Sequence, residues 1–165
     1  MKTTSQKIIL VGLAAWAFGQ VLDAADLGTK RTLTLEIARS ITAAAEKKAL
    51  DNKWAMVISI LDDGGNLLQL DRMDGAPIGS VEVAQQKAHT AVIFKSPSKD
   101  FADGLAKGTT ALLKLNVLPF EGGIPLVVDG QVIGAIGVSG GTAEQDGTVA
   151  KAGADWFAAN TKSKK

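Results

Sequence analysis

The first half of the chain carries a helical pattern of apolar positions followed by two strand patterns. Thr34 can cap a helix that runs to about Asn52. Residues 55–61 form an apolar run typical of a buried strand, and residues 66–73 alternate between apolar and polar side chains as a half-buried strand does. The Asp62-Asp63-Gly64-Gly65 turn between them predicts a hairpin. The stripe that identifies the helix consists of Ile37, Ile41, Ala44, Ala45 and Ala49.

The middle of the chain is predicted to be helical. Apolar residues recur at helical spacing from about Ile78 to Phe94, and Ser96-Pro97 interrupts this pattern because proline cannot continue a helix. We expect Ser98 to cap a shorter second helix. The stripe of the longer helix consists of Val81, Ala84, Ala88 and Val92.

A second hairpin is predicted later in the chain. Ile124–Val128 and Gln131–Val138 are rich in Val and Ile, and Asp129-Gly130 between them is suited to a two-residue turn. Gly134 and Gly137 interrupt the second of these strands. A glycine inside a strand indicates a bulge or a close approach by another backbone or a ligand.

The order of the elements predicts the fold class. Thr142 and Gln145 match a capping box, so a final helix begins near Thr142. The resulting order, α-ββ-αα-ββ-α, favours an α+β fold in which an antiparallel sheet of two hairpins carries packed helices. Four strands leave two sheet edges and much apolar surface in a small domain. Association between copies would cover them, so we expect a homo-oligomer.

The N-terminus resembles an export signal. Lys2 and Lys7 precede an unbroken apolar run at residues 8–18, and Asp23-Ala24-Ala25 offers small residues for cleavage. The run is shorter than the roughly 20 residues that span a bilayer, so we expect no stable membrane insertion. The prediction is a signal peptide at residues 1–25, a single domain at residues 26–165, and a periplasmic or secreted protein. An uncleaved amphipathic or anchoring helix is the alternative.

The composition of the chain argues against several classes of partner and chemistry. Without residues 1–25 the chain loses two of its 18 Lys and Arg residues and one of its 17 Asp and Glu residues, so its net charge becomes zero. This balance argues against polyanionic partners, and the 5% aromatic content without tyrosine argues against nucleic acid. The absence of cysteine from the sequence excludes disulfides and thiolate chemistry.

Six short segments of the chain form a recognisable set of motifs: residues 62–65, Lys87-Ala88-His89-Thr90-Ala91, Gly122-Gly123-Ile124-Pro125, residues 129–140, Gln145-Asp146 and Ala152-Gly153. Together they resemble the GlcG/HbpS-type family of haem-binding, also called haem-degrading, domains. The resemblance covers about residues 33–157, with a departure at Gly147, where an acidic residue is expected. It implies a profilin-like or PAS-like fold, a homo-oligomer, and haem or a related tetrapyrrole as ligand.

His89 is the only histidine in the sequence and the first candidate for chemistry. Glu82, Gln86 and His89 share one flank of the predicted 78–94 helix because residues three or four apart lie on one face. One hypothesis makes His89 a haem iron ligand or an acid–base group, with Glu82 or Gln86 in support. The alternative is a hydrogen-bonded, inert histidine at the edge of the core.

Two methionines and one threonine are the further candidates for contact with haem. Met56 lies in a predicted core strand and is expected to pack there, whereas Met73 at a strand end is expected to be more accessible. Thr90 could offer a hydroxyl contact, or it could serve only helix packing.

Glycines flank the same end of the second hairpin. Their backbone amides, with the helix start at Thr142, could bind a carboxylate or a haem propionate, or the glycines could serve only tight turns. Glu121 and Asp146 bracket this region and could bind a cation or transfer protons, although isolated carboxylates are usually solvated. The residues of this end are Gly122, Gly123, Ser139, Gly140 and Gly141.

Three functions therefore remain open. The preferred hypothesis is an exported protein that binds haem in an oligomer interface or a surface cleft. The second is an enzyme that acts on a small organic acid or other metabolite, with His89, Glu121 or Asp146 as acid–base groups. The third is a structural subunit without a ligand.

Overall fold

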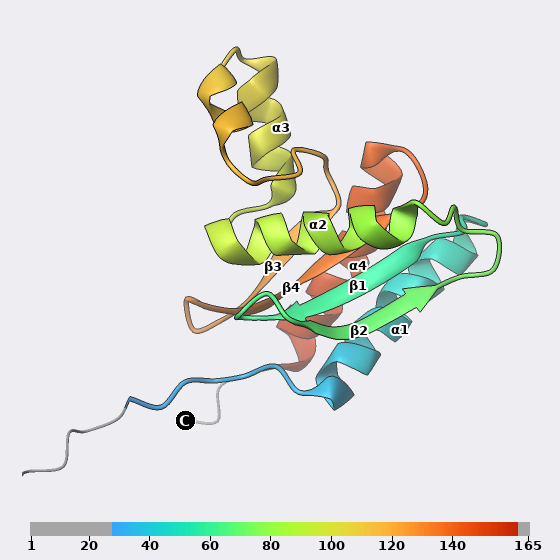
Figure 1. Cartoon of the computed structure of the whole chain (residues 1–165). Coiled ribbons are helices and arrows are strands. Elements are labelled where there is room, and N and C mark those ends of the chain that lie inside the picture. Colours follow the sequence, from blue (N-terminus) through green and yellow to red (C-terminus); the bar gives the residue numbers. More distant parts are fainter. Residues whose placement is uncertain (1–27, 162–165) are drawn as a thin grey trace, which may run out of the picture.

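The computed structural model describes residues 28–161 and contains a four-stranded antiparallel sheet with helices on both faces (Figure 1). The predicted signal peptide at residues 1–25 lies outside the described residues. The elements are α1 (Leu35–Asp51), β1 (Val57–Asp62), β2 (Leu67–Arg72), α2 (Ser80–Phe94), α3 (Ser98–Ala106), the 3₁₀ helix η1 (Thr110–Lys114), β3 (Gly123–Val128), β4 (Gln131–Ser139) and α4 (Ala143–Asn160).

The predicted order α-ββ-αα-ββ-α is confirmed. The strands lie in the order β2-β1-β4-β3, and the two hairpins join through the antiparallel pair β1 and β4. β2 and β3 are the two edges of the sheet. The 3₁₀ helix η1 is an addition, since no hydrophobic pattern in the sequence predicts it.

The predicted helix starts are confirmed for α1 and α4 and wrong for α3. Thr34 Oγ1 accepts a hydrogen bond from the Ile37 amide, and Thr142 and Gln145 form both hydrogen bonds of the capping box. Ser98, however, is the first residue of α3 and does not cap it. Its hydroxyl donates to the Phe120 carbonyl at 2.5 Å and accepts from the Gly123 amide at 2.8 Å, which fastens α3 to the start of β3.

The two sheet faces are covered differently. α1 and α4 cover one face, and their apolar stripes form the main core together with inward side chains of the strands, among them Ile58 and Ile136, and with Met56 just before β1. α2 covers the other face of the sheet (Figure 1). α3 and η1 stand away from the sheet beyond α2, so this segment and the loop after it border the exposed side of α2.

Two glycines let α2 lie directly on the sheet. Gly123 and Gly137 are register partners in β3 and β4. A Cβ on Gly137 would lie 2.0 Å from the Ala84 carbonyl oxygen, and a Cβ on Gly123 would lie 2.1 Å from the Lys87 carbonyl oxygen. The close backbone approach predicted for Gly137 is therefore confirmed, and α2 is the element that makes it.

The second hairpin turns as predicted. Asp129 and Gly130 both have positive φ, at 48° and 76°, which a two-residue turn between twisted strands requires.

Among the helices of residues 28–161, none is long and apolar enough to cross a membrane.

Candidate functional site

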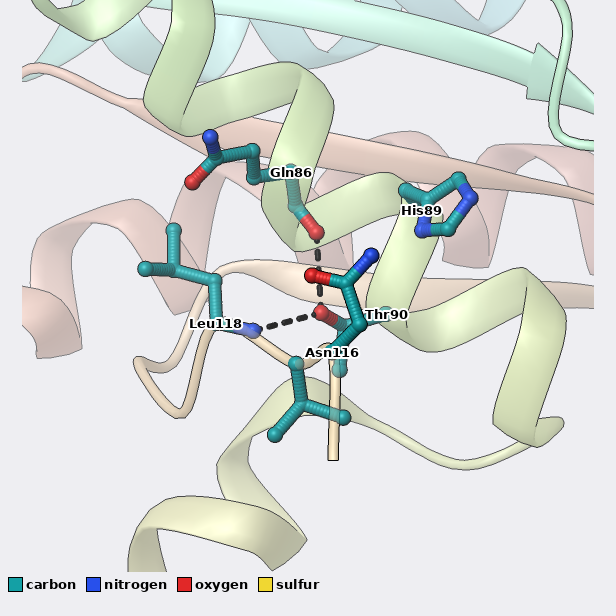
Figure 2. Close-up of a pocket in the computed structure, with 6 residues that line it drawn as sticks. Gln86, His89, Thr90, Asn116 and Leu118 are labelled. Atoms are coloured by element: carbon teal, nitrogen blue, oxygen red, sulfur yellow. Dashed lines mark hydrogen bonds between the residues drawn. The ribbon is translucent and has the colours of Figure 1, made fainter. Parts of the chain in front are cut away.

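His89 lines an open cavity of about 300 Å³ between α2 and the loop before β3. We call it the histidine pocket. Figure 2 shows its side chains around the opening, with the His89 ring and the Gln86 side chain on different sides of Thr90. The lining residues are Gln86, His89, Thr90, Asn116, Val117 and Leu118.

Thr90 holds the two walls of the histidine pocket together. Its buried hydroxyl donates to the Gln86 carbonyl at 2.9 Å and accepts from the Leu118 amide at 2.8 Å (Figure 2). The hydroxyl therefore fixes the loop against α2. The predicted direct contact of this hydroxyl with a ligand would compete with these two hydrogen bonds.

The predicted flank of α2 is present. The Gln86 side-chain amide donates to the Glu82 carboxylate at 2.8 Å, but Glu82 is not among the residues that line the pocket.

The His89 ring lies beside the β1–β2 turn, where a Cβ on Gly65 would be 3.2 Å from the His89 Cδ2 atom. Gly65 has a φ of 81° and leaves room for the ring. His89 is half-buried, with one side toward this turn and another toward the cavity.

A second cavity of about 430 Å³ contains a buried ion pair, and we call it the ion-pair pocket. Lys87 Nζ lies 2.6 Å from Asp146 Oδ2, and the two side chains are only 3% and 4% exposed. Lys87 Nζ also donates to the Val138 carbonyl at 3.1 Å, and Asp146 Oδ1 accepts from the Gly141 amide at 3.0 Å. The lining residues are Val83, Lys87, Leu118, Phe120, Ser139, Gly141, Ala143 and Asp146.

Burial raises the pKa of Asp146 above its usual range. The hydrogen bonds from Lys87 and Gly141 favour the carboxylate and act in the opposite direction. A buried carboxylate beside a buried ammonium is stable only when both groups keep their partners.

The alternative interpretation of Asp146 as an isolated, solvated carboxylate is wrong, because this side chain is buried and paired with Lys87. The predicted anion site at the glycine amides has fewer donors to offer than expected. The Gly141 amide already donates to Asp146, and the Gly123 amide donates to Ser98. The protein's own oxygen atoms thus occupy these two donors.

Glu121 lines a third cavity, of about 290 Å³, together with Gly122 and Gly123. Lys99 Nζ lies 3.5 Å from Glu121 Oε2. A Cβ on Gly147 would lie 2.2 Å from Glu121 Oε1, so the glycine at this position leaves room for the Glu121 side chain. His89, Glu121 and Asp146 line three different cavities, and the structure does not gather them into one acid–base centre.

Met73 lies on the other side of the sheet from His89. It is half-buried and packs against the main core beneath α1 and α4. Met56 is fully buried in the same core, as predicted. The structure therefore separates Met73 from the histidine pocket.

Lys87 is the residue that the site predictions missed. It precedes Ala91 by four positions and follows Ala84 by three, so helical spacing already places it on the buried face of α2. A lysine at such a position needs a buried partner, and this requirement could have identified it. Asn116, Val117 and Leu118 lie in a loop without periodicity and carry no comparable signal.

Comparisons with known proteins give a consistent result. The family described as "Haem degrading protein HbpS-like" matches residues 33–155. Protein GlcG of Escherichia coli strain K12 is 45% identical over 113 residues, which cover 67% of this chain and 84% of GlcG.

Two solved structures share the fold. A double mutant of HbpS from Streptomyces reticuli has a TM-score of 0.73 and 28% identity, and the match covers 93% of this chain and 98% of that chain. A complex of PduOC with haem has a TM-score of 0.69 and 32% identity, and the match covers 76% of this chain and 94% of that chain.

Proposed function

The chain belongs to the HbpS-like family, which is described as haem degrading, and from this membership we propose that it binds haem in the histidine pocket. The observation that carries the proposal is the position of His89. The only imidazole in the sequence lines an open cavity instead of being enclosed in the core. A structural relative, PduOC, is known in complex with haem.

The side chains of the histidine pocket fit part of a tetrapyrrole. His89 supplies a nitrogen ligand of the kind that haem iron takes from proteins. Val117 and Leu118 offer apolar surface to the macrocycle, and the amides of Gln86 and Asn116 can donate hydrogen bonds to propionates. At about 300 Å³ the cavity is at the small end of ligand pockets, so an edge of the macrocycle would remain outside it.

Each part of the chain around the pocket has a separate task in this proposal. Haem, when bound, supplies the redox chemistry of its iron. His89 would ligate the haem iron, and Gln86 and Asn116 would orient the propionates, while Thr90 keeps the 116–118 loop against α2. The Gly65 turn lies beside the imidazole.

Export and self-association are further parts of the proposal. The charged start and apolar run at residues 2–18 support export to the periplasm or beyond the cell.

Self-association is supported by exposed apolar side chains and sheet edges. The side chains of Ile78, Leu113 and Phe120 are each more than half exposed, and β2 and β3 are open sheet edges. A second copy covering these features would produce a homo-oligomer and enclose the exposed edge of a bound macrocycle.

Haem titration tests the central proposal. Haem is added to residues 26–165, to the His89→Ala variant and to a control variant, Arg39→Ala, whose exposed side chain lies on α1 on the other face of the sheet. We expect saturable binding with a shifted Soret band that His89→Ala alters and Arg39→Ala does not. The absence of binding by the unmodified chain, or identical spectra for the chain and His89→Ala, contradicts the assignment.

A further inference from the structure

The ion-pair pocket is a second cavity that haem binding at His89 does not use. It lies on the other side of Leu118, which is the only lining residue that the two cavities share. Its polar groups come from α2, from the end of β4 and from the first turn of α4. The two cavities therefore offer different polar groups to a ligand and share one apolar side chain.

The Lys87 ammonium has an unused donor. It carries three N–H groups, and within residues 28–161 only Asp146 and the Val138 carbonyl accept from it. Each N–H of a buried ammonium strongly favours an acceptor, so a ligand atom at the third N–H would add a charge-assisted hydrogen bond. The cavity that Lys87 lines is where an acceptor can reach it.

The Ser139 hydroxyl is a second polar group without a partner. Ser139 lines the same cavity and is only 6% exposed, yet its hydroxyl forms no hydrogen bond with any described residue. The rest of the lining is mainly apolar, with Val83, Leu118 and Ala143 around the opening. An apolar cavity with a few unfilled polar groups is the usual form of a small-molecule site.

Charge decides which acceptor fits. Lys87 and Asp146 neutralise each other, and Asp146 already takes the amide of Gly141 near the start of α4. A ligand carboxylate would add a second negative charge beside Asp146, whose side chain is only 4% exposed. An uncharged carbonyl oxygen accepts the same hydrogen bonds without that repulsion.

We propose that the ion-pair pocket binds a small uncharged carbonyl compound, whose oxygen accepts from Lys87 and Ser139 while its alkyl groups contact Val83, Leu118 and Ala143. The carbonyl satisfies the third Lys87 donor and gives the Ser139 hydroxyl a partner. The ion pair itself stays intact, so binding requires no proton transfer.

Butanone and propanoate are matched probes, because a methyl group of the first replaces a carboxylate oxygen of the second. Each is titrated into residues 26–165 and followed by amide chemical shifts in NMR spectra. We expect butanone to shift the amides of Lys87, Ser139 and Gly141 with saturation, and propanoate to bind at least about tenfold more weakly. Equal or tighter binding of propanoate contradicts the uncharged acceptor, and no saturable shift with butanone contradicts the site.

Two variants locate the binding without breaking the ion pair. Ser139→Ala removes one hydrogen bond and is expected to weaken butanone binding about 2- to 10-fold. Ala143→Phe places a ring at the opening and is expected to abolish it, whereas Ala158→Phe, at an exposed position near the other end of α4, is the matched control. Unchanged butanone binding by Ala143→Phe overturns the proposal.

Butanone binding in the ion-pair pocket and haem binding in the histidine pocket can be tested separately. His89→Ala is expected to leave butanone binding unchanged, and Ser139→Ala is expected to leave the haem spectrum unchanged. Failure of one proposal is therefore distinguishable from failure of the other.

Discussion

The Lys87 carbonyl oxygen lies directly over Gly123, so close that a Cβ on residue 123 would stand 2.1 Å from it. The contact brings the backbone of α2 onto the edge strand β3. It also sets the depth of Lys87, whose side chain reaches below the helix to Asp146. The position of the ion pair thus depends on a glycine that has no side chain.

Gly137→Ala is expected to destabilise the fold by at least about 2 kcal/mol, because the new methyl group would overlap the backbone of α2 and neither element can move freely. Urea unfolding followed by circular dichroism measures the change. Gly79→Ala is the control, since Gly79 has an ordinary φ of −64° and no atom within 4 Å of the added Cβ. Similar stability of the two variants would contradict the close packing of α2.

Lys87→Met is expected to cost about 3–5 kcal/mol, because it leaves the buried Asp146 carboxylate without its partner. The double variant Lys87→Met/Asp146→Leu removes both charges and is expected to recover much of this loss. Together with the single variant Asp146→Leu, these chains form a double-mutant cycle that urea unfolding measures. Additive losses in the double variant would show that the two side chains do not depend on each other.

The order of the elements could be predicted from the sequence because their signals are local. Asp129-Gly130 has the turn chemistry of a hairpin, and Thr142 with Gln145 forms the predicted capping box. Ser98 was misassigned because the same hydroxyl that suits a helix cap also suits a bond to a distant strand. Only the tertiary structure decides between the two.

The candidate site was harder to predict than the fold. His89, Gln86 and Thr90 were found together because they follow one another on a single helix. The ion pair joins residues 59 positions apart, and no local pattern in the sequence indicates that the Asp146 carboxylate is buried. Such a pairing depends on where the sheet places the middle of α2 relative to the first turn of α4, and helical spacing on either helix alone does not specify this.

Acid pH is expected to remove the stabilising contribution of Asp62. Burial acts to raise the pKa of this carboxyl, but hydrogen bonds from the Asn66 amide and side chain and from the Gly64 amide outweigh it and hold the pKa below its usual range. A lowered native pKa means that the stabilisation is present above about pH 4 and is lost as the pH falls through the native value.

Asp62→Ala is therefore expected to be less stable than the unmodified chain at pH 7, with a difference that shrinks below about pH 4. Urea unfolding of both chains over this range measures it. A difference that does not change with pH would assign the role of Asp62 to turn geometry instead of charge.

Thr90→Val tests whether the hydrogen bonds of the Thr90 hydroxyl fix the 116–118 loop against α2. Valine keeps the shape of the side chain but cannot accept from the Leu118 amide or donate to the Gln86 carbonyl. We expect a stability loss of about 1 kcal/mol and faster hydrogen exchange at the Leu118 amide. Because the 116–118 loop then moves relative to His89, haem affinity should fall while the histidine signature in the Soret band persists. Loss of that signature with an unchanged Leu118 exchange rate would instead indicate that the Thr90 hydroxyl contacts the ligand directly.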